Sequence, residues 1–274
     1  MRAFTFALMV VVSVPAVADA VLERGAYLMK AVVACGNCHT QQTPAGPAVG
    51  MELAGGNVLV DDPRMTAQAP NITPASKVGD WSDAELKRAI REGVRPDGSI
   101  IGPPMPFPLY RHLSDEDLDA VVAYVRRVAP VEHETPASVY RIPLPPAWGS
   151  PVTGPVEAPS REDAAAYGAY IAGPLAHCTE CHSTPDERGV PDPEHALGGG
   201  GLEFTGPWGV SVAANITPTN LGDWTDAEIE TAIRTGKRKD GGQLKPPMPF
   251  GYYANMTDAD MKALIAYLRS LQEL

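Results

Sequence analysis

The chain has 274 residues, enough for two domains of ordinary size, and carries a formal net charge of −11 at pH 7. This acidic balance argues against nucleic acid as a partner. It favours solubility and electrostatic steering toward a basic docking surface. Beyond the N-terminal segment, no stretch approaches the roughly eighteen apolar residues of a membrane-spanning helix, so we expect no transmembrane anchor in the mature protein.

Residues 1–20 have the pattern of a secretory signal peptide. Arg2 supplies the positive charge, and residues 4–14 form a short apolar run. Small residues end that run, with cleavage expected after Ala18 or Ala20. We therefore expect a protein exported to the bacterial periplasm, soluble or peripherally associated with the membrane.

Residues 22–33 predict a first helix, which leads into a motif that occurs twice. The motif is C-x-x-C-H, formed by Cys35, Cys38 and His39 and again by Cys178, Cys181 and His182. It is the attachment signal for c-type haem. The two thiols bind the porphyrin covalently, and the histidine is the proximal iron ligand. The two copies use all four cysteines, so the sequence predicts two covalently bound haem c groups.

Two other uses of the cysteines fit the sequence less well. A redox dithiol of the thioredoxin type would lie near a βαβ pattern, and none is apparent. A structural zinc site would have to bring together cysteine pairs that lie 143 positions apart, from Cys35 to Cys178. It would also leave the two motif histidines without a role.

Residues 21–130 and 161–274 are two copies of one module, which indicates an internal duplication. The matched positions are offset by 143 or 144 and include Gly25 with Gly168, Tyr27 with Tyr170, 71–74 with 215–218, and 79–81 with 222–224. Each haem motif can therefore be checked against the other.

The periodicity predicts an all-α fold for both modules. A helix precedes each haem motif, the second over 162–172, and a long loop rich in Gly and Pro follows. The next helix opens with a capping box, at Ser82 in the first module and Thr225 in the second. It stops at a glycine, Gly93 or Gly236.

The last helix of each module is amphipathic. It opens at Ser114 in the first module and at Thr257 in the second, with an aspartate three positions later in each case. Apolar residues then recur at helical spacing. We expect the first and last helices of each module to cross, with Gly25 and Gly168 allowing close approach.

Two methionines are the candidates for the second axial ligand of each iron. Met105 and Met248 lie in an identical Pro-Pro-Met-Pro-Phe sequence, at the same distance from the first cysteine of their motifs. The flanking prolines stiffen the loop. A single methionine usually fills a core, but the duplication favours ligation. The histidines outside the motifs are weaker candidates because they have no histidine counterpart in the other module or lie between the modules: His112, His133, His177 and His195.

Residues 131–160 form a proline-rich linker between the modules. Such a segment is extended and semi-rigid. Its apolar residues suggest that it packs along a module: Val139, Tyr140, Ile142, Leu144 and Trp148.

The order of these motifs resembles class I cytochrome c. More narrowly, it is similar to the cytochrome c subunits of bacterial membrane-bound alcohol, gluconate and sorbitol dehydrogenases. The resemblance implies two tandem class I cytochrome c domains. It also implies that Asn71, Trp81, Asn215 and Trp224 lie along the haem edge near the propionates. Alternatively, the asparagines organise a turn and the tryptophans belong to the core.

Two functions agree with this sequence. The first is an electron carrier, itself not an enzyme, between a dehydrogenase and a cytochrome or oxidase of the respiratory chain, or the cytochrome subunit of that dehydrogenase. The second is a dihaem enzyme, such as a peroxidase or a sulfur-compound oxidase, which needs one displaceable axial ligand. Because both modules offer the same His–Met pair, the sequence favours the carrier.

A group of cations stands out in this acidic chain: Arg234, Lys237, Arg238, Lys239 and Lys245. They either complement the end of the helix that stops at Gly236 or ring the exposed edge of the second haem and attract an acidic redox partner.

Overall fold

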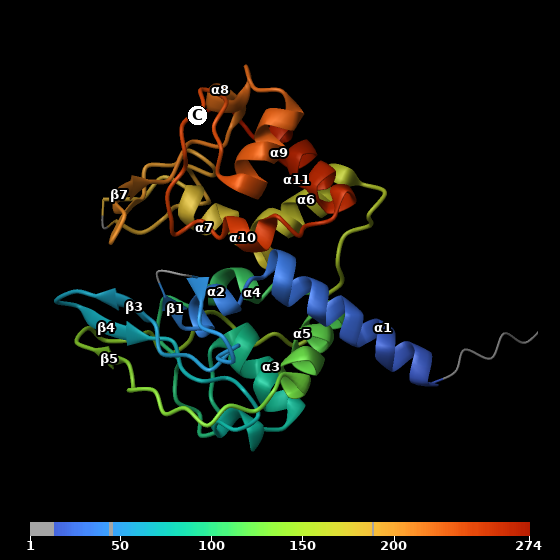
Figure 1. Ribbon diagram of the computed structural model, residues 1–274, viewed down its shortest axis with the longest axis vertical. Coiled ribbons are helices and arrows are strands. Elements are labelled where there is room, and N and C mark those ends of the chain that lie inside the picture. The colour runs from blue at the N-terminus through green and yellow to red at the C-terminus, as the bar shows by residue number, and fades with distance from the viewer. Residues whose placement is uncertain (1–13, 44–45, 188) are drawn as a thin grey trace, which may run out of the picture.

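The computed structural model describes residues 14–43, 46–187 and 189–274. Its ribbon forms two lobes, the lower one containing the first module and the upper one the second (Figure 1). Residues 1–13, most of the predicted signal peptide, lie outside the described residues. The first helix, α1 (Val14–Tyr27), begins earlier than the predicted residue 22.

The helices follow the duplication. Those of the first module after α1 are η1 (Leu28–Val32), α2 (Gly36–His39), η2 (Lys77–Gly79), α3 (Asp83–Glu92), α4 (Phe107–Tyr110) and α5 (Asp115–Arg127). Those of the second module are α6 (Ala164–Tyr170), η3 (Ile171–Leu175), α7 (Cys178–His182), α8 (Pro218–Leu221), α9 (Asp226–Thr235), α10 (Phe250–Tyr253) and α11 (Asp258–Ser270). In each module a π-helical turn, η1 or η3, continues the first helix toward the haem motif.

The first and last helices of each module pack closely, as predicted. Helix α1 contacts α5, and α6 contacts α11. A Cβ atom at Gly25 would overlap the carbonyl oxygen of Ala120, and one at Gly168 would overlap that of Ala263. Glycine is therefore required at both crossings, because any side chain would force the two helix backbones apart.

Both predicted capping boxes are present. The Ser82 hydroxyl accepts a hydrogen bond from the Glu85 amide at the start of α3, and Thr225 does the same with Glu228 at the start of α9. Helix α3 ends at Gly93, whose φ is 67°, and α9 ends at Gly236. Positive φ at these ends is the left-handed conformation that favours glycine.

The all-α prediction is wrong for the loops, which contain short antiparallel strands. The strands are β1 (Gln42–Thr43), β2 (Gly46–Pro47), β3 (Val58–Asp61), β4 (Met65–Gln68), β5 (Val139–Tyr140), β6 (Glu203–Gly206) and β7 (Gly209–Val212). They pair as β1–β2, β3–β4–β5 and β6–β7. The β3–β4 turn is closed by Asp62, whose Oδ1 accepts from the amides of Arg64 and Met65. These side-chain-capped turns allow hairpins within segments rich in Gly and Pro.

Segment 131–160 packs along the first module, as its apolar residues suggested. Strand β5 pairs with β4. The Tyr140 hydroxyl donates to the Pro103 carbonyl at 2.9 Å, and Trp148 Nε1 donates to Ile101 at 2.8 Å. The Trp148 ring lies 5.6 Å from that of Phe107. The segment therefore supports the loop that carries Met105.

The two modules share one buried apolar cluster. It includes Leu28 and Val121 from the first module and Ile171 and Leu264 from the second. Helix α4 contacts η3, and α10 contacts η1; we call this surface the module interface. Figure 1 shows α2, α4, α7 and α10 at the boundary between the lobes. Both haem motifs therefore lie close to the module interface.

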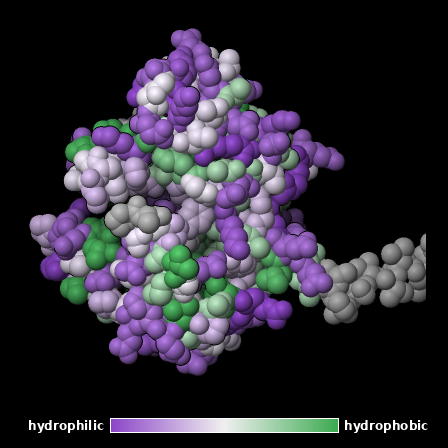
Figure 2. Space-filling view, viewed as in Figure 1, coloured by the Kyte–Doolittle hydropathy of each residue, from purple (hydrophilic) through white to green (hydrophobic). Residues whose placement is uncertain are grey.

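The face of the molecule seen in Figure 2 is mainly hydrophilic. Figure 2 shows hydrophilic residues over most of one face, with hydrophobic residues in separate patches between them. The most exposed of the large apolar side chains belong to strands and loops rather than to the long helices: Val49, Val58, Val139, Val190, Val210 and Val212. The apolar residues of the long helices are used for the shared core.

Candidate functional site

The backbone turns sharply just before each haem motif. After the π-helical turn, Ala34 has a φ of 52° and His177 a φ of 42°. Positive φ is uncommon for residues other than glycine and clusters at functional sites. The short helices α2 and α7 then begin at the first cysteine or next to it. Local sequence did not reveal this turn because the two residues that make it, Ala and His, share no chemistry.

The motif cysteines are unpaired and half-buried. Burial raises the pKa of Cys35 and of Cys178 to about 12. Burial, with a smaller contribution from the nearby Glu180 of the other module, raises the pKa of Cys38 to about 11. A redox dithiol depends on a lowered thiol pKa, so these surroundings disfavour that alternative.

The two motif histidines are held in one tautomer. His39 Nδ1 lies 2.9 Å from the Pro70 carbonyl oxygen, and His182 Nδ1 lies 2.7 Å from that of Ala214. A carbonyl oxygen can only accept, so Nδ1 carries the proton and Nε2 keeps its lone pair. Burial lowers the pKa of both rings, which favours the neutral form. A neutral imidazole whose other nitrogen donates to a carbonyl is the usual form of a metal-binding histidine.

The methionines lie in matching loops beside the core. Met105 and Met248 are partly buried and packed against the shared apolar cluster. Helices α4 and α10 begin directly after the proline that follows each methionine, and both loops contain a cis X-Pro bond. In the second module, Met248 and Cys178 line the same apolar cavity, together with Tyr253 and Leu264. A thiol and a thioether thus share one set of apolar walls, and this chemistry fits a covalently attached, largely apolar porphyrin.

The asparagines of the repeated Asn-Ile-Thr-Pro sequence organise turns. Asn71 Oδ1 accepts from the Thr73 amide at 2.8 Å, and Asn215 Oδ1 accepts from Thr217 at 2.8 Å. The Asn71 side-chain amide donates to the carbonyls of 131 and 133. These bonds favour the turn role over a role at a propionate. The tryptophans of the repeat, Trp81 and Trp224, pack partly buried against the core.

The cation group near α9 is largely engaged locally. Arg234 pairs with Glu230 and Asp258, at 2.7 and 3.0 Å, and Arg238 pairs with Asp240 at 2.7 Å. The ammonium groups of Lys239 and Lys245 donate to the carbonyls of 223 and 210. These contacts hold the cations to neighbouring groups of the second module, and none of them is made to a carbonyl at the end of α9.

Comparison with known families assigns both halves of the chain to one class of domain. Residues 165–272 match the cytochrome c family, and residues 20–125 match the family described as cytochrome c oxidase, cbb3-type, subunit III. The protein therefore consists of two cytochrome c domains in tandem.

Individual relatives narrow this class. The chain is 31% identical to a nicotinate dehydrogenase subunit of Pseudomonas putida, over 92% of this chain and 21% of the relative. It is 30% identical to the gluconate 2-dehydrogenase cytochrome c subunit of Pantoea cypripedii, over 92% of this chain and 60% of the relative. It is 29% identical to a diheme cytochrome c-type protein of Cereibacter sphaeroides, over 86% of this chain and 81% of the relative. The chain thus spans less than two thirds of the first two relatives.

These relatives confirm the resemblance to cytochrome c subunits of dehydrogenases. Such subunits are electron-transfer components rather than the catalytic part of a complex. Within the described residues, no helix has the length and apolar character needed to cross a bilayer.

Proposed function

We propose that the protein is a periplasmic dihaem c-type cytochrome that carries electrons between a dehydrogenase and the respiratory chain, or serves as the cytochrome subunit of that dehydrogenase. Cys35 and Cys38 hold one haem covalently, and Cys178 and Cys181 hold the other. The axial ligands are His39 with Met105 and His182 with Met248.

The observation that carries this proposal is the repeated setting of the two histidines. In both modules Nδ1 is bound to a carbonyl, and Nε2 is left as a ligand. A methionine lies in the same proline-stiffened loop of each module. A bound haem supplies a one-electron centre whose potential depends on its axial ligands and on its burial. The protein's own residues attach it, keep the imidazole neutral and surround it with apolar side chains.

The alternative of a dihaem enzyme has less support. An enzyme of that kind needs one iron with a displaceable ligand and a nearby acid or base. The two loops carry the same sequence around the methionine and the same α-helical turn after it. Within the described residues, no difference between these two loops marks one site as the open one.

The proposal is tested by the intact mass and the optical spectrum of the exported protein. The mature chain should exceed the mass of its apoprotein by two haems, and reduced protein should show almost no spectral shift with carbon monoxide. A double Cys178→Ala, Cys181→Ala variant should retain one haem. A wild-type mass increase of one haem or none would contradict the proposal, and a large carbon monoxide shift would favour the dihaem enzyme.

A further inference from the structure

The same hydrogen bond occurs twice across the module interface, with the roles of the modules exchanged. Tyr27 of the first module donates to Asp260 Oδ2 of the second at 2.7 Å. Its counterpart in the second module, Tyr170, donates to Asp117 Oδ2 of the first at 2.8 Å. The tyrosine of each module thus contacts the aspartate of the other module. That reciprocity defines an isologous contact, made here within a single chain.

Each tyrosine also satisfies the start of the other module's last helix. The Ser114 amide donates to the Tyr170 hydroxyl at 2.9 Å, and the Thr257 amide donates to the Tyr27 hydroxyl at 3.2 Å. Ser114 and Thr257 are the N-caps of α5 and α11. Each hydroxyl therefore accepts from a backbone amide and donates to a carboxylate, so that neither polar group is left without a partner.

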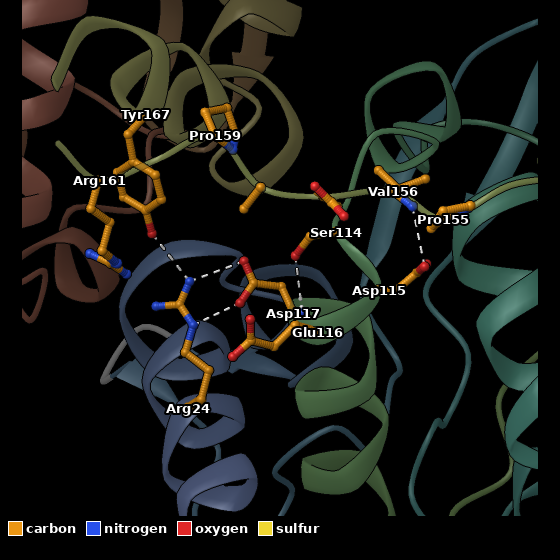
Figure 3. A pocket seen from close by; sticks show the side chains of 12 residues that line it. Arg24, Ser114, Asp115, Glu116, Asp117, Pro155, Val156, Pro159, Arg161 and Tyr167 are labelled. Carbon is orange, nitrogen blue, oxygen red and sulfur yellow. Dashed lines mark hydrogen bonds and ion pairs between the residues drawn. The ribbon is translucent and has the colours of Figure 1, made fainter. Parts of the chain in front are cut away.

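The carboxylates in these contacts are buried and compensated. The side chains of Asp117 and Asp260 are 5% and 1% exposed. Arg24 Nε lies 2.7 Å from Asp117, and Arg161 Nη1 lies 2.7 Å from Asp260. Buried charges require such partners. Figure 3 shows Arg24 between Tyr167 and Asp117, at the wall of a cavity of about 750 Å³ between the modules.

The tyrosines lie on the helices that lead into the haem motifs. Tyr27 is the last residue of α1 and Tyr170 the last of α6, and η1 and η3 continue directly toward Cys35 and Cys178. Contacts across the interface reach the motifs themselves. The ring of Tyr110 lies 6.1 Å from that of His177, which precedes Cys178. Gly36 of the first motif lies against the hydroxyl of Tyr252, where a Cβ atom would not fit.

We infer that Tyr27 with Asp260 and Tyr170 with Asp117 are positioning residues, which fix the separation of the two haem motifs so that electrons are exchanged between the haems inside one molecule. This inference rests on the proposed function. One electron is exchanged in each transfer, so that oxidation of one Fe(II) to Fe(III) is matched by reduction of the other Fe(III) to Fe(II). No proton moves and no bond is broken. Electron transfer weakens steeply with distance, so a fixed separation sets its rate.

The test uses the holoprotein with Tyr27→Phe, Tyr170→Phe and the double variant. Losing the Tyr170 hydroxyl leaves the buried Ser114 amide and the Asp117 carboxylate short of a partner, which should raise the population of altered module orientations about tenfold. Tyr27→Phe should have a smaller effect, because its amide partner belongs to the exposed Thr257. Pulsed electron paramagnetic resonance of the oxidised protein should show a broadened inter-haem distance distribution. Laser-flash photoreduction should show several-fold slower electron equilibration between the haems, most in the double variant.

The matched control is Tyr124→Phe. Tyr124 also donates to a carboxylate, that of Glu52, but both residues belong to the first module. This variant should leave the inter-haem distance and the equilibration rate unchanged. A double variant with wild-type distance and rate would overturn the inference, and so would a control that alters both. If the double variant does not mature, the single variants decide by the same criteria. Loss of covalent haem from the wild type would instead overturn the proposed function.

Discussion

At the scale of single residues, the two methionines carry the most testable chemistry. Met105→Ala or Met248→Ala should open one iron to carbon monoxide and lower the potential of that haem. The weak absorption band of methionine-ligated ferric haem should fall by roughly half in each variant, because the proposed ligation places one methionine on each of two irons. Absorption spectra and a redox titration of each variant measure these effects.

The control for this prediction is Met256→Leu. Met256 lines the same cavity as Met248 and is 3% exposed. Its counterpart in the first module is Leu113, so the fold already accommodates leucine at this position. The band should keep its full intensity. An unchanged spectrum in Met248→Ala would mean that the sixth ligand of the second module is another residue.

The sequence was informative about residues whose role is local and poor about residues whose role depends on packing. Ser82 and Thr225 were predicted as caps because their partner lies three positions away. Asp117 and Asp260 follow their caps at the same spacing, and their amides donate to the capping hydroxyls as predicted. The contact of each aspartate with a tyrosine of the other module could not be predicted, because it depends on how the modules pack.

At the scale of helices and strands, the glycines at the crossings set how closely the modules' helices approach. Gly25→Ala or Gly168→Ala would place a Cβ atom on the facing backbone, which cannot move as a side chain could. Overpacking of this kind costs about 1–3 kcal/mol, and alanine's better helix propensity recovers up to about 1 kcal/mol. Denaturant unfolding should show lower midpoints for both variants.

Gly251→Ala serves as the control, because α10 contains Gly251 and a Cβ atom there meets no neighbour within 4 Å. Its stability should equal or exceed that of the wild type. A Gly25→Ala variant as stable as this control would show that the crossing tolerates a wider helix separation.

The short strands were not predicted, because their pairing depends on packing rather than on local sequence. Each strand has two to four residues, too few to establish an alternating pattern. Strand β4 is paired on one side by β3 and on the other by β5, more than seventy residues away along the chain. Local sequence cannot specify such a partner. The long helices were predictable because their caps and apolar periodicity lie within a few turns.

At the scale of the whole molecule, the distribution of charge suggests how partners are recognised. Reversing Lys237, Arg238 and Lys239 to Glu tests whether this side of the second module attracts an acidic partner. Because Arg238 and Lys239 already have local partners, we expect the rate of electron exchange with the natural partner to change by less than about threefold at low ionic strength. Any effect of such surface charges acts mainly on the association rate. Stopped-flow kinetics at several salt concentrations measure the effect. A rate that falls tenfold or more in the variant, with the loss removed by salt, would identify the group as a docking surface.

The reciprocal contact between the modules has a consequence for how this chain arose and what the duplication made possible. An isologous contact is the one that two identical copies of a single module would make as a homodimer, with two equivalent haem sites. Joining the copies in one chain keeps the pairing but lets each position change by itself: residue 34 is alanine, whereas its counterpart, residue 177, is histidine. The fused pair can therefore present one face to an electron donor and a different face to an acceptor. In a symmetric dimer every change appears in both subunits, so the two subunits cannot acquire different faces for a donor and an acceptor.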